Sequence, residues 1–331
     1  MPDNDHHTPQ FILRGFASRV TRGQHYVFLF RRDQPGKVSE PNTRNVATVA
    51  GFYGAADAAL TRRESEVQAA AVQEACRSGV TAELKPAIVE LVTTLNARSR
   101  NLRTTLVELG GQLYRSTASM LGTGYGRGML VDLMVKVTEE DPAWSARLAG
   151  IRRGVRRKKL ERALASGLGD RVLARMREQH NPEKMATDSH ISGLSRVIGV
   201  ARPDLMQLDW TVHTVSEPLI LGDAGPLAVP VDGSAIVPLF HIGQQYRAVL
   251  FPLSSQHLLV GGTLAIDDDT VEQVNVAGVE VSREFFVSSQ NTDREKRYAA
   301  ALGSRAEPFD DERWNAMALE ALKELLSGSP S

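Results

Sequence analysis

The chain has 331 residues, of which 42% are apolar and 24% are charged, and this length is enough for one large domain or two ordinary ones. These proportions are typical of a folded globular protein and exclude a disordered or low-complexity chain. Basic and acidic residues balance at 39 each, so attraction to an anionic partner must come from local charge asymmetry. The single cysteine, Cys76, cannot form an internal disulfide, which indicates a reducing compartment.

The first 54 residues predict a short helix and then a β-hairpin. We expect a helix over residues 8–16, because Thr8 can cap it and Pro9 is tolerated at its first turn. Residues 25–30 are rich in strand formers and end at a turn sequence over 33–36. A second extended stretch, 46–53, is expected to pair with them.

The middle of the chain is predicted to be helical and its C-terminal part to be rich in strands. From residue 55 to about 200, apolar side chains recur at intervals of three and four, as in Ile88, Leu91, Val92 and Leu95. After residue 208 the period shortens, and strands are expected over 208–213, 219–221, 235–240, 247–251 and 257–260. Helices are expected over 271–287 and, as an amphipathic element, over 311–326.

Strands at both ends and helices between them predict an α+β fold. We expect one mixed sheet, built from the N-terminal hairpin and the C-terminal strands, because two separate apolar sheet edges would invite aggregation. The predicted divisions are 1–54 (helix and hairpin), 55–205 (helical block) and 206–331 (C-terminal strands and closing helices). The helix over 8–16 is expected to pack on the C-terminal strands, since Phe11, Leu13 and Phe16 require burial.

Several segments resemble a bacterial family of unknown function whose opening motif is typically written HYVPQFYLRNF. The similar segments are 6–16 (HHTPQFILRGF), 45–47 with 52–53, Glu66 with the alanines 69–71, 98–103, 219–223 and 251–254. The chain departs from the motif at His7, which replaces the usual tyrosine. The resemblance points to where a site would lie and implies no particular reaction.

Four residues in or near these segments are candidates for acid–base chemistry: His6, Gln10, Glu66 and Asp223. His6 is a neutral-pH acid or base, and Gln10 could fix its tautomer or bind a substrate carbonyl. Asp223 ends an apolar strand, where sheets often hold catalytic carboxylates. The alternative is structural, with His6 and Gln10 anchoring the first helix and Asp223 opening a turn.

The sequence alone does not decide whether the protein binds a metal ion. His6, Glu66 and Asp223 together would suit Mg²⁺, Mn²⁺ or Zn²⁺. However, the chain has none of the short-spaced metal motifs H-x-x-x-H, H-E-x-x-H or C-x-x-C.

Two groups of basic residues are candidates for binding phosphate. Arg98 and Arg103 could hold phosphates or carboxylates through their planar guanidinium groups, although ion pairs within the protein are the alternative. The segment 147–177 carries eleven basic and two acidic residues, and a partial apolar stripe predicts an amphipathic helix with a basic face. The candidates for contacting a nucleic-acid backbone there are Arg152, Arg153, Arg156, Arg157, Lys158 and Lys159. Neutralisation by acidic residues elsewhere in the fold or in another subunit is the alternative.

The sequence is compatible with two functions. The first is an intracellular, effector-like hydrolase of the nuclease type that acts on nucleic acid or nucleotides, with its candidate residues in one cleft. The second is a non-catalytic module that binds nucleic acid or protein, in which the His6–Gln10 motif is a structural latch. The chain contains no window of about 18 apolar residues and no signal peptide at residue 1, so we expect a cytoplasmic protein without a membrane segment.

Overall fold

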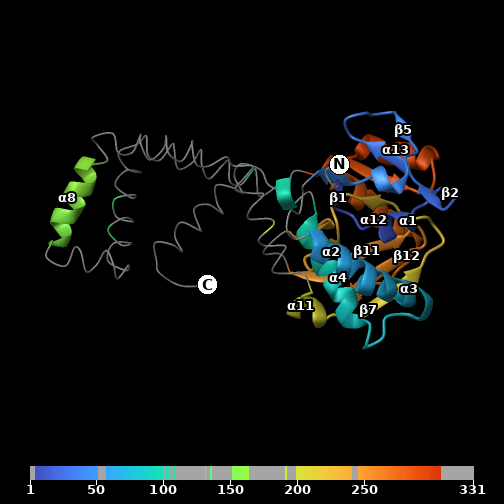
Figure 1. The fold of residues 1–331 in the computed structure, drawn as a ribbon, viewed down its shortest axis with the longest axis horizontal. Helices are drawn as coiled ribbons and strands as arrows, with labels where there is room; N and C mark the ends of the chain where they lie inside the picture. Colours follow the sequence, from blue (N-terminus) through green and yellow to red (C-terminus); the bar gives the residue numbers. More distant parts are fainter. Residues whose placement is uncertain are drawn as a thin grey trace. The chain divides into compact units, whose positions relative to one another are not determined.

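The computed structural model describes residues 4–50, 57–99, 102–104, 108, 131, 135, 151–163, 191, 199–240 and 245–306. The chain divides into two compact units, and Figure 1 draws the described residues of each as coloured ribbon. The first consists of Met1–Thr105 with Thr187–Pro308, and the second of Leu106–Ala186 with Phe309–Ser331. The fold is α+β, as predicted, and every strand pairing in the described ranges is antiparallel rather than mixed.

The larger sheet of the first unit is built from C-terminal strands. Its order is β10 (Val237–Pro238), β9 (Leu227–Pro230), β11 (Tyr246–Ser254), β12 (His257–Gly262) and β7 (Trp210–Thr214). Residues 248–253 of β11 are all buried, so this central strand is covered on both faces. The expected strand over 235–240 is reduced to the two residues of β10, and β9 was not predicted.

A second sheet joins the two ends of the chain. Its order is β5 (Val38–Ser39), β4 (Phe28–Arg31), β13 (Phe285–Ser288) and β8 (Leu221–Gly222). Phe30 of β4 stacks on Phe286 of β13 with ring centroids 4.5 Å apart, which ties the N-terminal hairpin to the C-terminal strand. The N-terminal hairpin does merge with C-terminal strands, but the strands of the described residues form four separate sheets instead of one.

Two sequence predictions about strands and helices are wrong. Within the predicted strand 46–53, the described residues Thr48–Ala50 form β6, which pairs with β1 (Asn4–His6) and not with the hairpin. The expected helix over 271–287 ends early, because α12 (Asp268–Glu280) is followed by a turn and by β13. A small hairpin of β2 (Arg19–Thr21) and β3 (Gln24–Tyr26) completes the strands, and the helix expected over 311–326 lies outside the described residues.

The first helix packs on the C-terminal strands as predicted, but it is shorter than expected and Thr8 does not cap it. α1 (Gln10–Arg14) follows Pro9, and Ile12, Leu13 and Phe16 are fully buried. The Gly15 carbonyl accepts a hydrogen bond from the Ser255 N–H at 3.0 Å, which joins the end of α1 to the β11–β12 turn. The opening segment is therefore held by the C-terminal strands.

A group of helices in contact with one another comes from the middle of the chain. α2 (Asp57–Arg63) continues into a π-helical turn (Glu64–Gln68) and α3 (Ala69–Ser78), and these contact α4 (Lys85–Arg98). The remaining described helices are η1 (Thr43–Asn45), α8 (Arg153–Ala163), α11 (Pro203–Met206) and α13 (Asp293–Ala301). No helix in the described ranges is both long and apolar enough to span a membrane.

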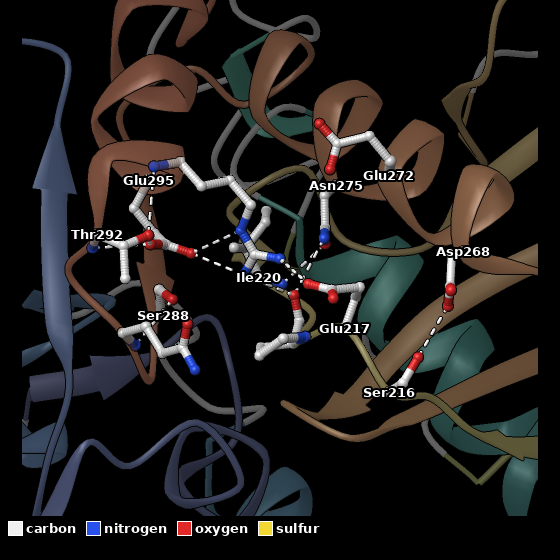
Figure 2. A network of polar contacts seen from close by, with 12 residues as sticks. Ser216, Glu217, Ile220, Asp268, Glu272, Asn275, Ser288, Thr292 and Glu295 are labelled. Atoms are coloured by element: carbon white, nitrogen blue, oxygen red, sulfur yellow. Dashed lines mark hydrogen bonds and ion pairs between the residues drawn. The ribbon is translucent and has the colours of Figure 1, made fainter.

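A buried polar network fixes α12 and α13 against the segment that leads into β8 (Figure 2). The side chain of Asn275, which is fully buried, donates to the Pro218 carbonyl at 3.1 Å and accepts from the Ile220 N–H at 3.0 Å. Glu295, also fully buried, closes a capping box with Thr292 at the start of α13. Because these groups satisfy each other within the fold, we interpret the network as structural.

Candidate functional site

The histidine and glutamine of the opening motif are in contact. His6 Nδ1 lies 3.0 Å from the Val46 carbonyl oxygen, an acceptor, and this contact favours a proton on Nδ1. Gln10 Nε2 lies 3.1 Å from His6 Nε2 and donates to the Thr43 carbonyl at 2.7 Å. Gln10 begins α1, so the contact depends on the turn before the helix and not on a shared helix face.

Arg98 joins this motif to the helical block from inside the protein. It ends α4, is only 2% exposed, and its guanidinium donates to Glu64 and to the backbone carbonyl of His6. The expected role of Arg98 in binding a phosphate ligand does not fit this position, because the guanidinium is buried among protein acceptors. Arg98 instead orders the backbone that carries His6.

The carboxylate that meets Arg98 is Glu64, not the predicted Glu66. Both residues lie in the π-helical turn, but their side chains point in different directions, as expected for helical positions two apart. Glu66 lies on the surface and forms an ion pair with Arg62 at 4.0 Å. Arg103 is half-buried beyond α4, and its N–H donates to the Ser99 carbonyl at 3.3 Å.

The π-helical turn also brings a buried carboxylate into contact with polar side chains. Glu90 of α4 is 4% exposed and accepts hydrogen bonds from Arg63 and from Gln68 Nε2, the latter at 3.2 Å. π-helical turns often occur at functional sites, because they disturb the regular hydrogen bonding of the helix. Here the turn presents Glu64 and Gln68 to α4.

Asp223 holds the turn between α12 and β13. Its carboxylate accepts from the backbone N–H groups of Arg283 and Glu284, each at 2.8 Å, and of Phe285 at 3.3 Å. Burial raises the pKa of Asp223 from its ordinary value of 3.8 to about 6, although the three N–H donors favour the anion. These three hydrogen bonds all come from backbone N–H groups of one turn, so the Asp223 carboxylate has a structural role there.

The Asp223 turn is a neighbour of the opening motif. The His7 ring, which is buried, lies 5.7 Å from the ring of Phe285, whose N–H donates to Asp223. Gly225 packs against Ser99 and the Leu95 carbonyl at the end of α4, the helix that carries Arg98. A direct role for Asp223 beside His6 and Gln10 stays a prediction.

A cavity of about 560 Å³ lies beside these elements, and sequence reasoning missed it. We call it the arginine cavity; its lining residues are Arg31, Arg32, Asp33, Thr48, Arg283 and Glu284. Thr48 of β6 stands directly opposite His6 of β1, and side chains of opposed residues lie on the same face of a sheet. The adjacent arginines 31 and 32 after a strand were the only available signal in the sequence, because Arg283 lies 251 positions beyond Arg32.

The basic helix predicted in the middle of the chain is present as α8 in the second unit. The exposed basic residues in and before it are Arg152, Arg153, Arg157, Lys158, Lys159 and Arg162, and Arg156 is half-buried. Val155 is 46% exposed, so the expected apolar stripe is not covered at this position within the described residues. The basic residues from 171 to 177 lie outside the described ranges.

Among the described residues, no group of three or more His, Cys, Asp or Glu side chains comes together in a way that could hold a metal ion. Glu66 and Asp223 contribute to separate contacts, with Arg62 and with the α12–β13 turn respectively. The structure therefore offers no support for the proposed ligand set of His6, Glu66 and Asp223.

A family model described as "Protein of unknown function (DUF4238)" matches residues 4–294. The chain belongs to this family. No curated protein and no solved structure matches it. The match covers the opening motif, the arginine cavity and α8.

Proposed function

We propose that this member of the DUF4238 family binds nucleic acid through α8, and the exposed basic surface of this helix is the observation that carries the proposal. Seven basic residues and one acidic residue lie between Ile151 and Ala163. The helix has 11 residues and is thus about 16 Å long, enough to follow several phosphates of one backbone. A solvated helix of mixed charge would not concentrate one sign in this way.

Two of the basic residues have a partner within the described segment. Arg157 Nε forms an ion pair with Glu161 Oε1 at 3.1 Å, one turn along the helix, and Arg156 Nε donates to the Ile151 carbonyl at 2.7 Å. Glu161 is the one acidic residue between Ile151 and Ala163, so this segment by itself carries a net positive charge. Such a surface attracts a phosphate backbone without reading base sequence.

The test is a binding titration by fluorescence anisotropy with a labelled duplex and a labelled single strand. If about four phosphates are contacted, the affinity should fall roughly 100-fold between 50 and 200 mM salt, because each contact releases counterions. The test variant exchanges four exposed basic residues for glutamine and leaves the Arg157–Glu161 pair intact: Arg153, Lys158, Lys159 and Arg162. A control variant removes the same charge from exposed positions of the first unit: Arg14, Arg22, Arg44 and Arg77.

We expect the α8 variant to lose at least tenfold in affinity at 50 mM salt and the control variant to bind nearly as tightly as the wild type. Two results would contradict nucleic-acid binding through α8. One is the absence of saturable binding at 50 mM salt. The other is an equal loss in both variants, which would indicate that only total charge matters.

A second candidate function is hydrolysis of a phosphoester of nucleic acid or nucleotides, and the position of His6 favours it. His6 is half-buried, contacts the Val46 carbonyl through Nδ1, and lies opposite Thr48 of the arginine cavity. Arginine side chains there could stabilise developing charge on phosphate while His6 Nε2 acts as a base. Hydrolysis of a generic phosphodiester by the wild type, lost in His6→Ala with an unchanged melting temperature, is the expected result. If no hydrolysis is detected while α8-dependent binding persists, the motif is a latch and the protein is a binding module.

A further inference from the structure

Two cavities share a wall at the turn between β4 and β5. The arginine cavity is one, and the second, of about 390 Å³, lies between this turn and α13; both are lined by Arg31. We propose that the two cavities together bind a nucleoside phosphate, with the phosphate in the arginine cavity and the base in the second cavity. The site lies wholly in the first unit and does not depend on α8.

The arginine cavity has the charge and the donors that a phosphate requires. Arg31, Arg32 and Arg283 line it together with two acidic residues, Asp33 and Glu284, so its lining carries a net positive charge. Guanidinium groups bind phosphate oxygens through paired, geometrically fixed hydrogen bonds. The cavity therefore favours a phosphate over a neutral ligand.

The arginines of this cavity are oriented by the protein. Arg31 forms two hydrogen bonds to Asp33, at 2.8 and 3.1 Å, and this bonding raises the pKa of the Arg31 guanidinium. Arg32 lies across Gly303, where a β-carbon would come within 2.8 Å of its Nε. Gly303 also has a φ of +76°, so glycine both permits this backbone and leaves room for the guanidinium.

The second cavity suits a flat heteroaromatic group. Its apolar wall comes from Phe30, Pro35 and Val38 together with Ala299 and Ala300 of α13. Its volume lies within the ~300–1,000 Å³ that small-molecule sites usually occupy. We call it the apolar cavity.

Polar groups on the apolar cavity complement the edge of a base. Gln34 and Asn291 line it, and their amides can each donate and accept hydrogen bonds, as base edges require. Lys37 and Lys296 add positive charge, and no carboxylate belongs to the lining, although Lys296 bonds Asp293 at 2.8 Å. Arg31 lies between the two cavities. A bound nucleoside phosphate would therefore place its base in the apolar cavity and its phosphate in the arginine cavity, with Arg31 between them.

The experiment is isothermal titration calorimetry of the full-length protein with AMP, GMP, CMP and UMP, the four matching nucleosides, and inorganic phosphate. We expect at least one nucleotide to bind saturably and at least tenfold more tightly than both its nucleoside and inorganic phosphate. Arg32→Gln should weaken nucleotide binding at least tenfold without a change in melting temperature, because Arg32 is exposed. Ala300→Trp should fill the apolar cavity and weaken nucleotide binding while leaving phosphate binding unchanged.

Two controls separate this site from the basic helix. Arg77→Gln removes an exposed arginine that lines neither cavity, and the four-residue α8 variant removes charge from the second unit; both should bind nucleotide as the wild type does. The proposal is overturned if none of the four nucleotides binds, if phosphate binds as tightly as every nucleotide, or if Arg32→Gln has no effect. Loss of nucleotide binding in the α8 variant would likewise overturn it.

Discussion

Replacing Arg98 by methionine should loosen the opening segment of the chain more than it affects any other described element. Arg98 is 2% exposed and donates both to Glu64, whose side chain is 18% exposed, and to the His6 carbonyl. Removing one member of a buried ion pair typically costs 3–5 kcal/mol, since the remaining charge is left without its partner. Because water reaches Glu64 in part, we expect a loss near the lower limit, about 3 kcal/mol.

Glu64→Gln in the Arg98→Met background should restore part of this loss, because the orphaned charge is removed as well. The resulting coupling energy should exceed about 1 kcal/mol, as for contacting pairs in double-mutant cycles. A matched control is Arg77→Met, which breaks an exposed ion pair with Glu74 and should cost less than about 1 kcal/mol.

The chain has two compact units, so a single global unfolding transition is not a sufficient measure. Hydrogen exchange of residues 4–16 under native conditions reports the local effect directly. We expect exchange there to accelerate in Arg98→Met and to stay unchanged in Arg77→Met. Unchanged exchange in Arg98→Met, or a loss below about 1 kcal/mol, would refute the anchoring role of Arg98.

Two further perturbations test how β8 is fixed. Between pH 3.8 and about 6 the folded chain keeps a proton on Asp223 that the unfolded chain has lost, so the free energy of unfolding should fall by roughly 3 kcal/mol as pH rises through this window. Asp223→Asn cannot titrate and should lack this component; denaturation from pH 4 to 7 checks it, and identical pH dependence in both proteins would refute the shifted pKa. Gly222→Ala should destabilise the first unit by about 1–3 kcal/mol, because its β-carbon would lie 2.6 Å from the Gly278 carbonyl oxygen and 2.0 Å from Ser282 Oγ. Gly154→Ala in α8 meets no atom within 4 Å and should be neutral or stabilising in the same thermal melt; equal losses in both variants would contradict the clash.

Patterns of apolar residues in the sequence predicted the helices and strands whose own side chains show which face is buried. The helix near residues 8–16 was predictable because Leu13 and Phe16 recur at helical spacing and require a core. The pairing of β1 with β6 was not, since Asn4–His6 has few strand formers and the partner lies more than 40 positions away. The end of α12 was missed for a related reason, because the turn after it is held by Asp223, about 60 positions earlier.

The site was predicted only where its contacts are close in sequence. His6 and Gln10 are four positions apart and do meet. The choice between Glu64 and Glu66 depended on the π-helical turn, which no spacing rule reveals. The arginine cavity combines β4, β6 and the α12–β13 turn, so its residues come together only through the tertiary fold.

The contacts of the opening motif explain how one set of residues can act as a latch and also shape the arginine cavity. Arg98 fixes the His6 carbonyl, and β1 in turn pairs with β6, so the motif determines where Thr48 stands at the wall of the arginine cavity. On the other side of that cavity, Asp223 fixes the backbone of Arg283. The buried polar residues therefore have structural contacts whose consequence is the shape of an exposed, positively charged cavity. A ligand bound there would be sensitive to His6, Arg98 and Asp223, even if only His6 were close enough to take part in chemistry.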